Sequence, residues 1–297
     1  MEVNIYQVDV FTNQAFGGNP AGIVPDARGL DPVDMQNIAR EMNLSETVFI
    51  IPTDEDNYQV RFFTPVSEVD LCGHGTVGAF YTLAYMGYIT GPYNGTKKVY
   101  QNTKAGKLSV EILFKDGNVD RVLMEQAIPQ EIGEIKDLKP LLKCFNIEEK
   151  HIGIGDKFIN PKIISTGLPD IMLPLKDKET LDNLNVDFRG LSNLSHKLNV
   201  IGVHAFYLPE ENSNKVYTRN FAPLVGINEE AATGTSNGSS IYFLKKAGYI
   251  EKEIIALQGE GLGRPSNIYC RIENVEENYV VKVGGQAKVV LEGVICI

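Results

Sequence analysis

The amino-acid sequence predicts an α+β protein of two pseudo-symmetric domains, each a curled β-sheet around a central helix. Two observations predict this fold class: the chain repeats itself, and both copies show the same order of strands, turns and helices. A length of 297 residues is also about two domains' worth of chain. We place the domains at residues 1–125 and 126–283, and we expect the strand-like residues from about 284 to 297 to return to the first domain.

The repeat becomes visible when the second half of the chain is laid on the first. Single coincidences mean little in a chain with 28 glycines, but matches that keep one order indicate an internal duplication. The matches are MQNIAREMNL (35–44) with LSNLSHKLNV (191–200), RFFTP (61–65) with RNFAP (219–223), Gly73 with Gly234, Gly87-Tyr88-Ile89 with Gly248-Tyr249-Ile250, and Gln101 with Gln258.

Each copy opens with a strand of alternating character, YQVDVFT or KFINPKIIST, followed by a Gly-x-Pro turn at Gly18 or Gly167. An amphipathic helix comes next. In the first copy Asp31 is a suitable N-cap for that helix, and Pro32 suits its first position.

A strand pair follows in each copy, ETVFIIP with YQVRFFTP and GVHAFYLP with KVYTRNFAP. A glycine-rich turn then leads into a more apolar helix that stops at Gly87 or Gly248. Residues 71–96 lack charged side chains, but their continuous apolar part is too short for a membrane span, so we expect a buried helix. The first copy closes with a hairpin turned at Asp116-Gly117. Residues 124–150 are the expected junction.

Composition excludes several classes of partner. The chain is 43% hydrophobic and 22% charged, with 38 acidic and 28 basic residues and a net charge of −10, which disfavours nucleic acid and anionic membranes. The four cysteines have no C-x-x-C spacing and are expected to be free thiols. The amino terminus has no signal-peptide pattern, so we expect a cytoplasmic protein.

Two glycine-rich turns, CGHGT (72–76) and TGTSNG (233–238), each join a strand to a helix. The first N–H groups of a helix have no partner inside it and carry the positive end of its dipole, so such turns bind carboxylates well. Two related turns facing each other would form a cleft between the halves. The alternative is that the glycines only let buried helices approach the sheet.

Titratable residues lie mainly on the first copy's side. Glu46 stands among apolar residues and opposite Gly202, so a partly desolvated Glu46 would suit a general base; alternatively, it pairs on a surface strand. His74 at a helix start favours the neutral imidazole of a proton relay, although a lone histidine is often structural. Cys72 would favour its thiolate there, but a two-thiol racemase would need a second cysteine at Thr233.

Other chemistries are disfavoured. His151, His196 and His204 are scattered along the chain, and none stands at metal-ligand spacing from His74, so we expect no metal site and no cofactor. The sequence GEGLG (259–263) is followed by strand-like residues instead of a helix, which makes a nucleotide loop improbable.

Four segments together resemble the phenazine-biosynthesis PhzF-like family, a branch of the diaminopimelate epimerase fold: VDVFTNQAFGGNPAGIV (8–24), NLSETVFI (43–50), RFFTPVSEVDLCGHGTVGA (61–79) and EEAATGTSNGSSIYFL (229–244). The resemblance covers essentially the whole chain. It implies two barrel-like domains, a cofactor-free site between them, and a homodimer. It further implies that Glu46 is the acid/base residue, that His74 assists, and that Gly73 and Gly234 offer N–H groups to a substrate carboxylate.

The second turn departs from the family pattern, which is an acidic residue followed by Pro-x-Thr-Gly-Ser. Here Glu230 replaces an aspartate and Thr235 a serine, which argues against the family's best-known substrate, a dihydro-hydroxyanthranilate. The sequence thus predicts a cofactor-independent isomerase or epimerase of a small carboxylated substrate. Its expected catalytic residues are Glu46, His74, Glu230 and Thr235, and its expected substrate-binding residues are Cys72, Gly73, Thr233 and Gly234. The alternatives are a thiol-dependent amino-acid epimerase using Cys72 and a catalytically silent binding protein for a small acid.

Overall fold

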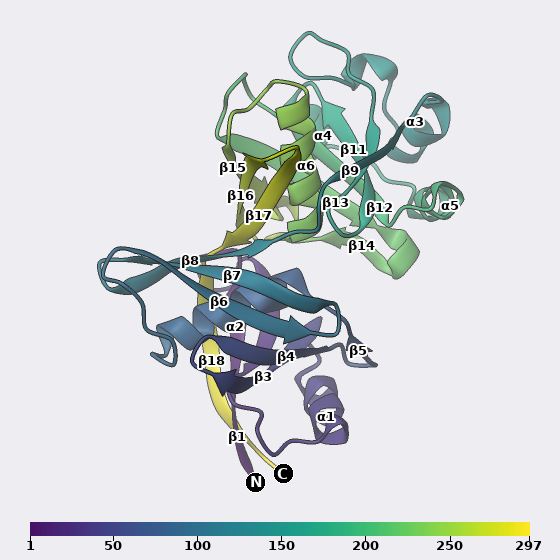
Figure 1. The fold of residues 1–297 in the computed structure, drawn as a ribbon. Helices are drawn as coiled ribbons and strands as arrows, with labels where there is room; N and C mark the ends of the chain where they lie inside the picture. Colours follow the sequence, from purple (N-terminus) through teal and green to yellow (C-terminus); the bar gives the residue numbers. More distant parts are fainter. The chain divides into compact units, whose positions relative to one another are not determined.

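The computed structural model describes all 297 residues, which form two compact units: residues 1–125 with 284–297, and residues 126–283. In each unit a curled sheet surrounds one helix, α2 (Gly73–Tyr85) in the first and α6 (Gly234–Lys246) in the second (Figure 1). The predicted α+β class and its helix-filled curled sheets are confirmed. No helix of the structure is long and apolar enough to span a membrane.

The first unit's sheet runs in the order β18, β1, β2, β3, β4, and β4 pairs with both β5 and β6, followed by β7 and β8. The β2–β3 and β4–β6 pairs are parallel, and the others are antiparallel. The strands are β1 (Glu2–Val10), β2 (Asn19–Val24), β3 (Glu46–Asp54), β4 (Asn57–Phe63), β5 (Glu68–Val69), β6 (Gly95–Thr103), β7 (Gly106–Lys115), β8 (Asn118–Glu125) and β18 (Ala287–Cys296).

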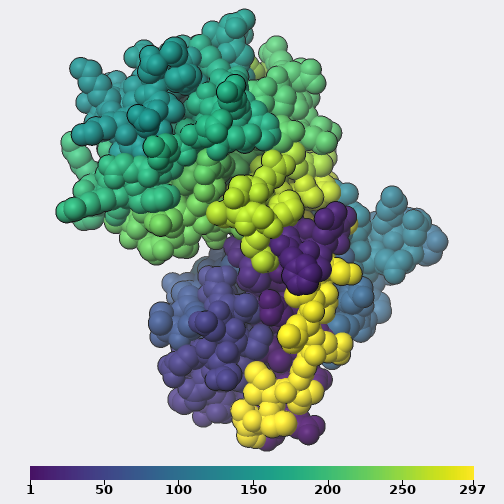
Figure 2. Space-filling view, turned by 180° about the vertical axis from the view of Figure 1, so that it is seen from behind, coloured from purple at the N-terminus to yellow at the C-terminus, as the bar shows by residue number.

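The carboxyl-terminal strand completes the first unit. Strand β18 is antiparallel to β1, and Figure 2 shows the two ends of the chain side by side at the surface. The same chain segment also approaches β8: a Cβ on Gly284 would stand 1.8 Å from the carbonyl oxygen of Val122, so only glycine fits there. Residues far apart in sequence therefore close the sheet around α2.

Helix α1 (Pro32–Met42) begins as the sequence predicts. The Asp31 carboxylate accepts hydrogen bonds from the N–H groups of Val33 and Asp34 at 2.8 and 2.9 Å, and Pro32 occupies the first helical position. The helix ends at Asn43, which adopts a left-handed conformation. This sharp stop lets the chain turn directly into β3.

The second unit repeats the pairing pattern of the first. Strand β11 is parallel to β12, β13 is parallel to β15, and the neighbouring pairs are antiparallel. The strands are β9 (Gln130–Glu134), β10 (Lys162–Ser165), β11 (Pro169–Leu175), β12 (Gly202–Tyr207), β13 (Lys215–Ala222), β14 (Ile227–Glu230), β15 (Glu253–Gln258), β16 (Ser266–Val275) and β17 (Asn278–Gly285). The internal duplication stays a prediction. A duplicated chain is expected to show the same order of parallel and antiparallel strand pairs in both units.

Shorter helices cover the second unit's sheet. They are α3 (Lys139–Phe145), α4 (Lys178–Asp182) and α5 (Phe188–Leu198), with single 3₁₀ turns at Glu149–His151, Pro223–Val225 and Glu260–Leu262. Buried side chains of α3 and α5, among them Phe145 and Leu191, pack with Phe221 of β13 in one apolar cluster. The sequence GEGLG (259–263) contains the last 3₁₀ turn between its first and last glycines and leads into β16, as expected.

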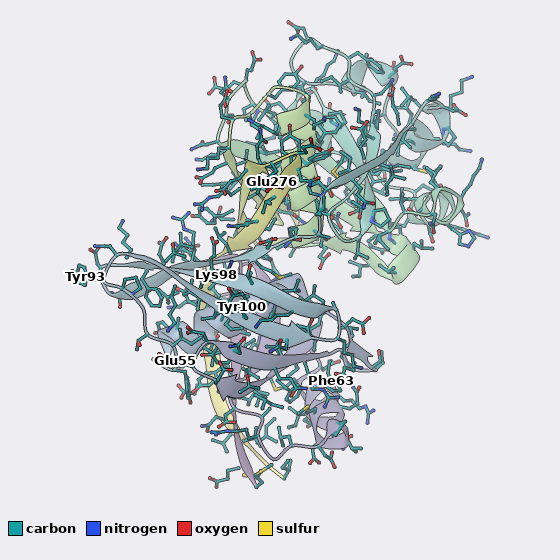
Figure 3. All side chains as sticks on the ribbon, viewed as in Figure 1. Glu55, Phe63, Tyr93, Lys98, Tyr100 and Glu276 are labelled. Carbon is teal, nitrogen blue, oxygen red and sulfur yellow. The ribbon has the colours of Figure 1, made fainter.

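The central helices are buried nearly all round, while the outer sheet faces are polar. Nine of the thirteen residues of α2 are buried. By contrast, Lys98 and Tyr100, labelled in Figure 3, lie on β6, where Lys98 and Lys107 place their ammonium groups 5.6 and 4.6 Å from the Tyr100 ring centroid. Because α2 is buried on nearly all sides, it packs inside the curled sheet instead of against one face of it.

The sequence interpretation missed two strands. It treated the Gly-x-Pro motifs as turns leading directly to a helix, but Asn19–Val24 and Pro169–Leu175 form β2 and β11. Both segments are short apolar runs buried on both faces of the sheet, so they lack the alternation that identifies a half-exposed strand. These strands bring the site residues into register, as described below.

Candidate active site

Glu46 is the first residue of β3. The strand's next four residues, Thr47 to Ile50, are fully buried, whereas the Glu46 side chain is 20% exposed. In the parallel pair β2–β3, Glu46 is registered with the buried Ala21. The carboxylate therefore stands at the end of a rigid strand, partly shielded from water.

The sequence CGHGT forms the beginning of α2. Cys72 is the extended N-cap residue, and its sulfur accepts a hydrogen bond from the N–H of Gly75 at 3.3 Å. Gly73 and His74 are the first two helical residues, and the His74 side chain is only 9% exposed. The turn thus holds a thiol and an imidazole beside helix N–H groups, which favour negative charge.

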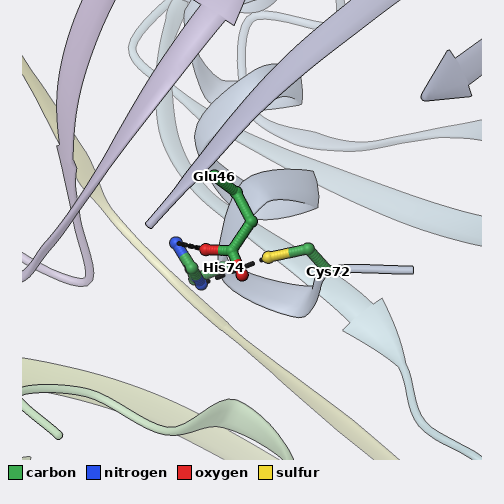
Figure 4. A group of neighbouring side chains, drawn as sticks. All are labelled: Glu46, Cys72 and His74. Atoms are coloured by element: carbon green, nitrogen blue, oxygen red, sulfur yellow. Dashed lines mark hydrogen bonds and ion pairs between the residues drawn. The ribbon is translucent and has the colours of Figure 1, made fainter. Parts of the chain in front are cut away.

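Three of the predicted site residues come together here. The Cys72 sulfur lies 3.2 Å from Nδ1 of His74, and Nε2 of His74 lies 3.2 Å from Oε2 of Glu46 (Figure 4). The imidazole therefore lies between a thiol and a carboxylate. Because a neutral imidazole donates at one nitrogen and accepts at the other, His74 can pass a proton between its two neighbours.

Two atoms of this cluster lack a hydrogen bond. Oε2 of Glu46 and Nε2 of His74 are buried and have no hydrogen-bond partner, although the pair is within ion-pair distance. Buried polar atoms without partners are rare in folded proteins and deserve a functional explanation. A substrate hydrogen or a cation would supply the missing partner.

The backbone at Gly73 is open. A Cβ built on Gly73 would meet no other atom within 4 Å. By contrast, a Cβ on Gly75 would lie 2.9 Å from a methyl group of Val48, so Gly75 is required for packing. The sequence left two explanations open for the glycines of this turn. Gly73 fits the first, because it leaves the backbone accessible, and Gly75 fits the second, because it lets the helix approach the sheet closely.

We expect Gly73→Ala to fold normally and to raise the KM for a carboxylate substrate about tenfold or more. If a substrate carboxylate binds the helix N–H groups here, the methyl group would stand in its way, and hydrogen bonds to charged groups contribute about 1.5–3 kcal/mol. Alanine is also the better helix former, so thermal stability should not fall. Steady-state kinetics beside Gly261→Ala, another glycine with open space, provide the check; an unchanged KM would contradict carboxylate binding at this turn.

In the second unit, two further predicted residues meet. Thr233 is the extended N-cap residue of α6, and its hydroxyl donates to the Glu230 carboxylate over 3.2 Å. Gly234 and Thr235 are the first two helical residues, and the Thr235 carbonyl accepts a hydrogen bond from the Thr166 hydroxyl at 2.8 Å. The roles assigned to these residues stay predictions.

A buried hydrogen-bond chain fixes the second turn. The Gln258 amide donates to the Glu230 carbonyl and the Thr233 hydroxyl, at 2.8 and 3.1 Å. The Gln258 side-chain oxygen accepts from Asn237 at 2.8 Å, and Asn237 in turn contacts Nε2 of His204 at 3.2 Å. Each side chain in this hydrogen-bonded series orients the next. Gln258 thereby fixes the Thr233 hydroxyl, which in turn fixes the Glu230 carboxylate.

The same chain continues to a buried acid. Asn220 contacts Nδ1 of His204 at 3.3 Å and donates to the Ser236 hydroxyl at 3.1 Å, and Ser236 donates to the carboxyl group of Asp170. Burial raises the pKa of Asp170 and lowers the pKa of His204 to about 4. Neutral His204 accepts at Nδ1 and donates at Nε2, which matches both of its contacts.

Sequence reasoning missed Asp170, His204 and Asn237. Asp170 lies on the unrecognised strand β11, and His204 was treated as one of several scattered histidines. Gln258 carried a signal, because it matches Gln101, whose side-chain oxygen accepts from Thr76 of α2 at 3.2 Å. Both units therefore place a buried glutamine next to their glycine-rich turn.

The chain is similar to known proteins over nearly its whole length. A family model described as "Phenazine biosynthesis-like protein" matches residues 8–293. An uncharacterized isomerase of Clostridium acetobutylicum is 37% identical over 97% of this chain and 96% of its own, and a trans-2,3-dihydro-3-hydroxyanthranilate isomerase of Pseudomonas fluorescens is 31% identical over 95% of both chains. The crystal structure of a Bacillus anthracis phenazine biosynthesis protein of the PhzF family matches over 100% of both chains, with a TM-score of 0.85 and 27% identity.

Proposed function

Because this chain belongs to the phenazine biosynthesis-like family, we propose that it is an isomerase that moves a carbon-bound proton on a small carboxylated substrate by general acid–base catalysis without a cofactor. The observation that carries the proposal is the contact of the Glu46 carboxylate with His74 beside the open helix start at Gly73. A base, a proton carrier and an anion-binding turn are the parts that such a reaction needs.

In the proposed reaction, Glu46 removes a proton from a carbon next to the substrate carboxylate or conjugated with it. The electron pair of the broken C–H bond moves into the carboxylate or the conjugated system, and the developing negative charge is stabilised by the N–H groups at the start of α2. His74 then accepts this proton from Glu46 over the 3.2 Å contact, which restores the carboxylate base. Return of the proton to another carbon gives an isomer, and return to the opposite face gives an epimer.

Residues of the second unit have proposed roles as well. Glu230 and Thr235 relay or donate the returning proton, and the α6 turn of Thr233 and Gly234 binds a second polar group of the substrate. The hydrogen bond from Thr233 to Glu230 supports the role of Glu230, because it holds that carboxylate in one position before the reaction.

The substrate is best found by a thermal-shift screen of small carboxylic acids, followed by NMR of each hit in deuterium oxide. The proposal predicts that the enzyme exchanges a carbon-bound hydrogen of the substrate for deuterium while the carbon skeleton stays intact. A tight ligand whose carbon-bound hydrogens never exchange would instead identify a silent binding protein. Exchange that requires an added metal or organic cofactor would contradict the cofactor-independent mechanism.

A second candidate function is a thiol-dependent epimerase. It is favoured by the position of the Cys72 sulfur, which contacts His74 at 3.2 Å and accepts the Gly75 N–H, because both neighbours stabilise a thiolate.

Cys72→Ser separates the two mechanisms. If Glu46 is the base, we expect the variant to retain deuterium exchange within about tenfold, because serine keeps the N-cap of α2. If Cys72 is the base, exchange should fall by about 10²-fold or more, since a serine hydroxyl is a far weaker acid than a thiol. Protection of wild-type Cys72 from iodoacetamide by substrate, read by peptide mass spectrometry, would show only that the thiol lies near the bound substrate, so the kinetic result decides.

A further inference from the structure

The cluster of Glu46, Cys72 and His74 has the composition of a metal site. No second histidine stands at ligand spacing from His74, so the sequence predicts no metal site. The structure supplies a thiol and a carboxylate instead: one ligand atom from each of the three residues lies within 4.8 Å of the others. Ligands on a tetrahedral zinc ion stand about 3.5 Å apart, given bond lengths of about 2.0–2.3 Å. Binding an ion would therefore draw the three ligand atoms closer together.

The burial of the cluster points to a ligand as well. His74 is 91% buried, its Nε2 atom has no hydrogen-bond partner, and neither has Oε2 of Glu46. Both atoms carry lone pairs when the imidazole is protonated at Nδ1, so a cation between these groups would give them the partner that they lack.

The donor set selects the kind of cation. A thiolate and an imidazole favour zinc and similar thiophilic ions, whereas magnesium and calcium prefer sites made of oxygen atoms. Three protein ligands also leave one coordination position open on a tetrahedral ion, which is the pattern of accessible zinc sites.

We propose that Glu46, Cys72 and His74 bind a thiophilic divalent cation such as Zn²⁺, and that the bound ion inhibits proton transfer. Binding forms a metal–sulfur bond and releases the thiol proton to solvent, with no change of oxidation state. Inhibition, unlike binding, rests on the proposed function: the ion occupies the lone pairs with which Glu46 would take a proton from the substrate.

Cobalt(II) provides a direct readout of binding that requires no activity. We expect titration of the full-length protein with Co²⁺ to give a thiolate-to-cobalt charge-transfer band with a stoichiometry of one ion per chain, and Zn²⁺ to abolish the band by displacement. In Cys72→Ser the band should disappear, while serine keeps the helix cap. In Glu46→Gln the band should persist with an affinity at least tenfold lower.

The matched control is Cys296→Ser, which removes the exposed cysteine and should leave the band unchanged. A band that survives in Cys72→Ser, a band lost in Cys296→Ser, or no band with Co²⁺ in excess would each overturn the site. A separate arm measures deuterium exchange with Zn²⁺ and then with a chelator: inhibition reversed by the chelator supports the second half of the proposal. Cobalt binding without zinc inhibition would overturn that half alone, and loss of exchange in Glu46→Gln tests the proposed function independently.

Discussion

Glu46→Gln is expected to fold as the wild type does and to lose solvent deuterium incorporation into the substrate by about 10² to 10⁴-fold, the usual contribution of a general base. The amide has the shape of the carboxylate but cannot take a proton. Folding should be preserved because Oε2 of Glu46 accepts no hydrogen bond that the substitution would break. The measurement is NMR of a substrate in deuterium oxide, with thermal unfolding of both proteins.

Glu41→Gln is a suitable control, because Glu41 is an exposed glutamate of α1, close to Glu46 in sequence. It should keep the wild-type exchange rate. If Glu46→Gln retained that rate while folding normally, Glu46 would not be the base, and the thiol of Cys72 would become the leading candidate.

The second large effect concerns stability, and it arises from His204. Burial lowers its pKa from 6.5 to about 4, so between these pH values the unfolded chain binds a proton that the native His204 does not. The stability due to neutral His204 is therefore complete above pH 6.5 and is lost as pH falls toward 4. The full loss amounts to about 3 kcal/mol. Protonation would also break the contact from Asn220 to Nδ1.

Asp170 works in the opposite direction. Burial raises its pKa, so the native state holds a proton that the unfolded chain releases, and its contribution to stability decreases as pH rises. The net pH dependence of the wild type therefore understates the effect of His204. The informative quantity is the difference between the wild type and a variant that cannot titrate at position 204.

Urea unfolding from pH 4 to 7 measures this difference. We expect the unfolding free energy of His204→Gln to decline less than that of the wild type, by about 3 kcal/mol over the range from 6.5 to 4. His196→Gln, which removes an exposed histidine of α5, should reproduce the wild-type curve. Parallel curves for His204→Gln and the wild type would show that His204 is not the titrating group.

Glu46 and Asp170 occupy corresponding positions in the two sheets. In the first unit the parallel pair β2–β3 registers Ala21 with Glu46, and in the second the pair β11–β12 registers Asp170 with Gly202. The acidic residue thus lies on the second strand of the pair, β3, in the first unit and on the first strand, β11, in the second unit. A side chain is excluded at Gly202, because its Cβ would stand 2.0 Å from a backbone oxygen of Phe221. Only the first unit can therefore present an acid at the end of this strand.

Each unit has an arginine–glutamate ion pair just before its glycine-rich turn. Arg61 forms two hydrogen bonds to Glu68 at 2.8 and 2.9 Å, and Arg219 forms two to Glu229 at 2.8 Å. The Arg61 guanidinium, together with Lys104, holds the pKa of Glu68 at about 2. Each pair fastens the short strand that precedes a glycine-rich turn, so Glu229 has a structural role.

The sequence by itself determined the elements whose signals are local. The cap at Asp31, the hairpin turn at Asp116-Gly117, the helix stops before Gly87 and Gly248 and the apolar central helices all depend on residues within a few positions of one another. It also singled out Glu46, Cys72 and His74, which the fold brings together.

Only the tertiary structure decided how these residues meet. Glu46 and His74 are far apart in sequence, and their 3.2 Å contact depends on the register of β3 against β2, a strand whose buried residues show no alternation. The hydrogen-bonded network from Asp170 through His204 to Gln258 likewise joins four strands and α6, and a polar residue's partners inside a core cannot be read from its neighbours in sequence. Local patterns fix elements because their energies act over one turn or one strand, whereas a site depends on contacts that form only when distant segments pack.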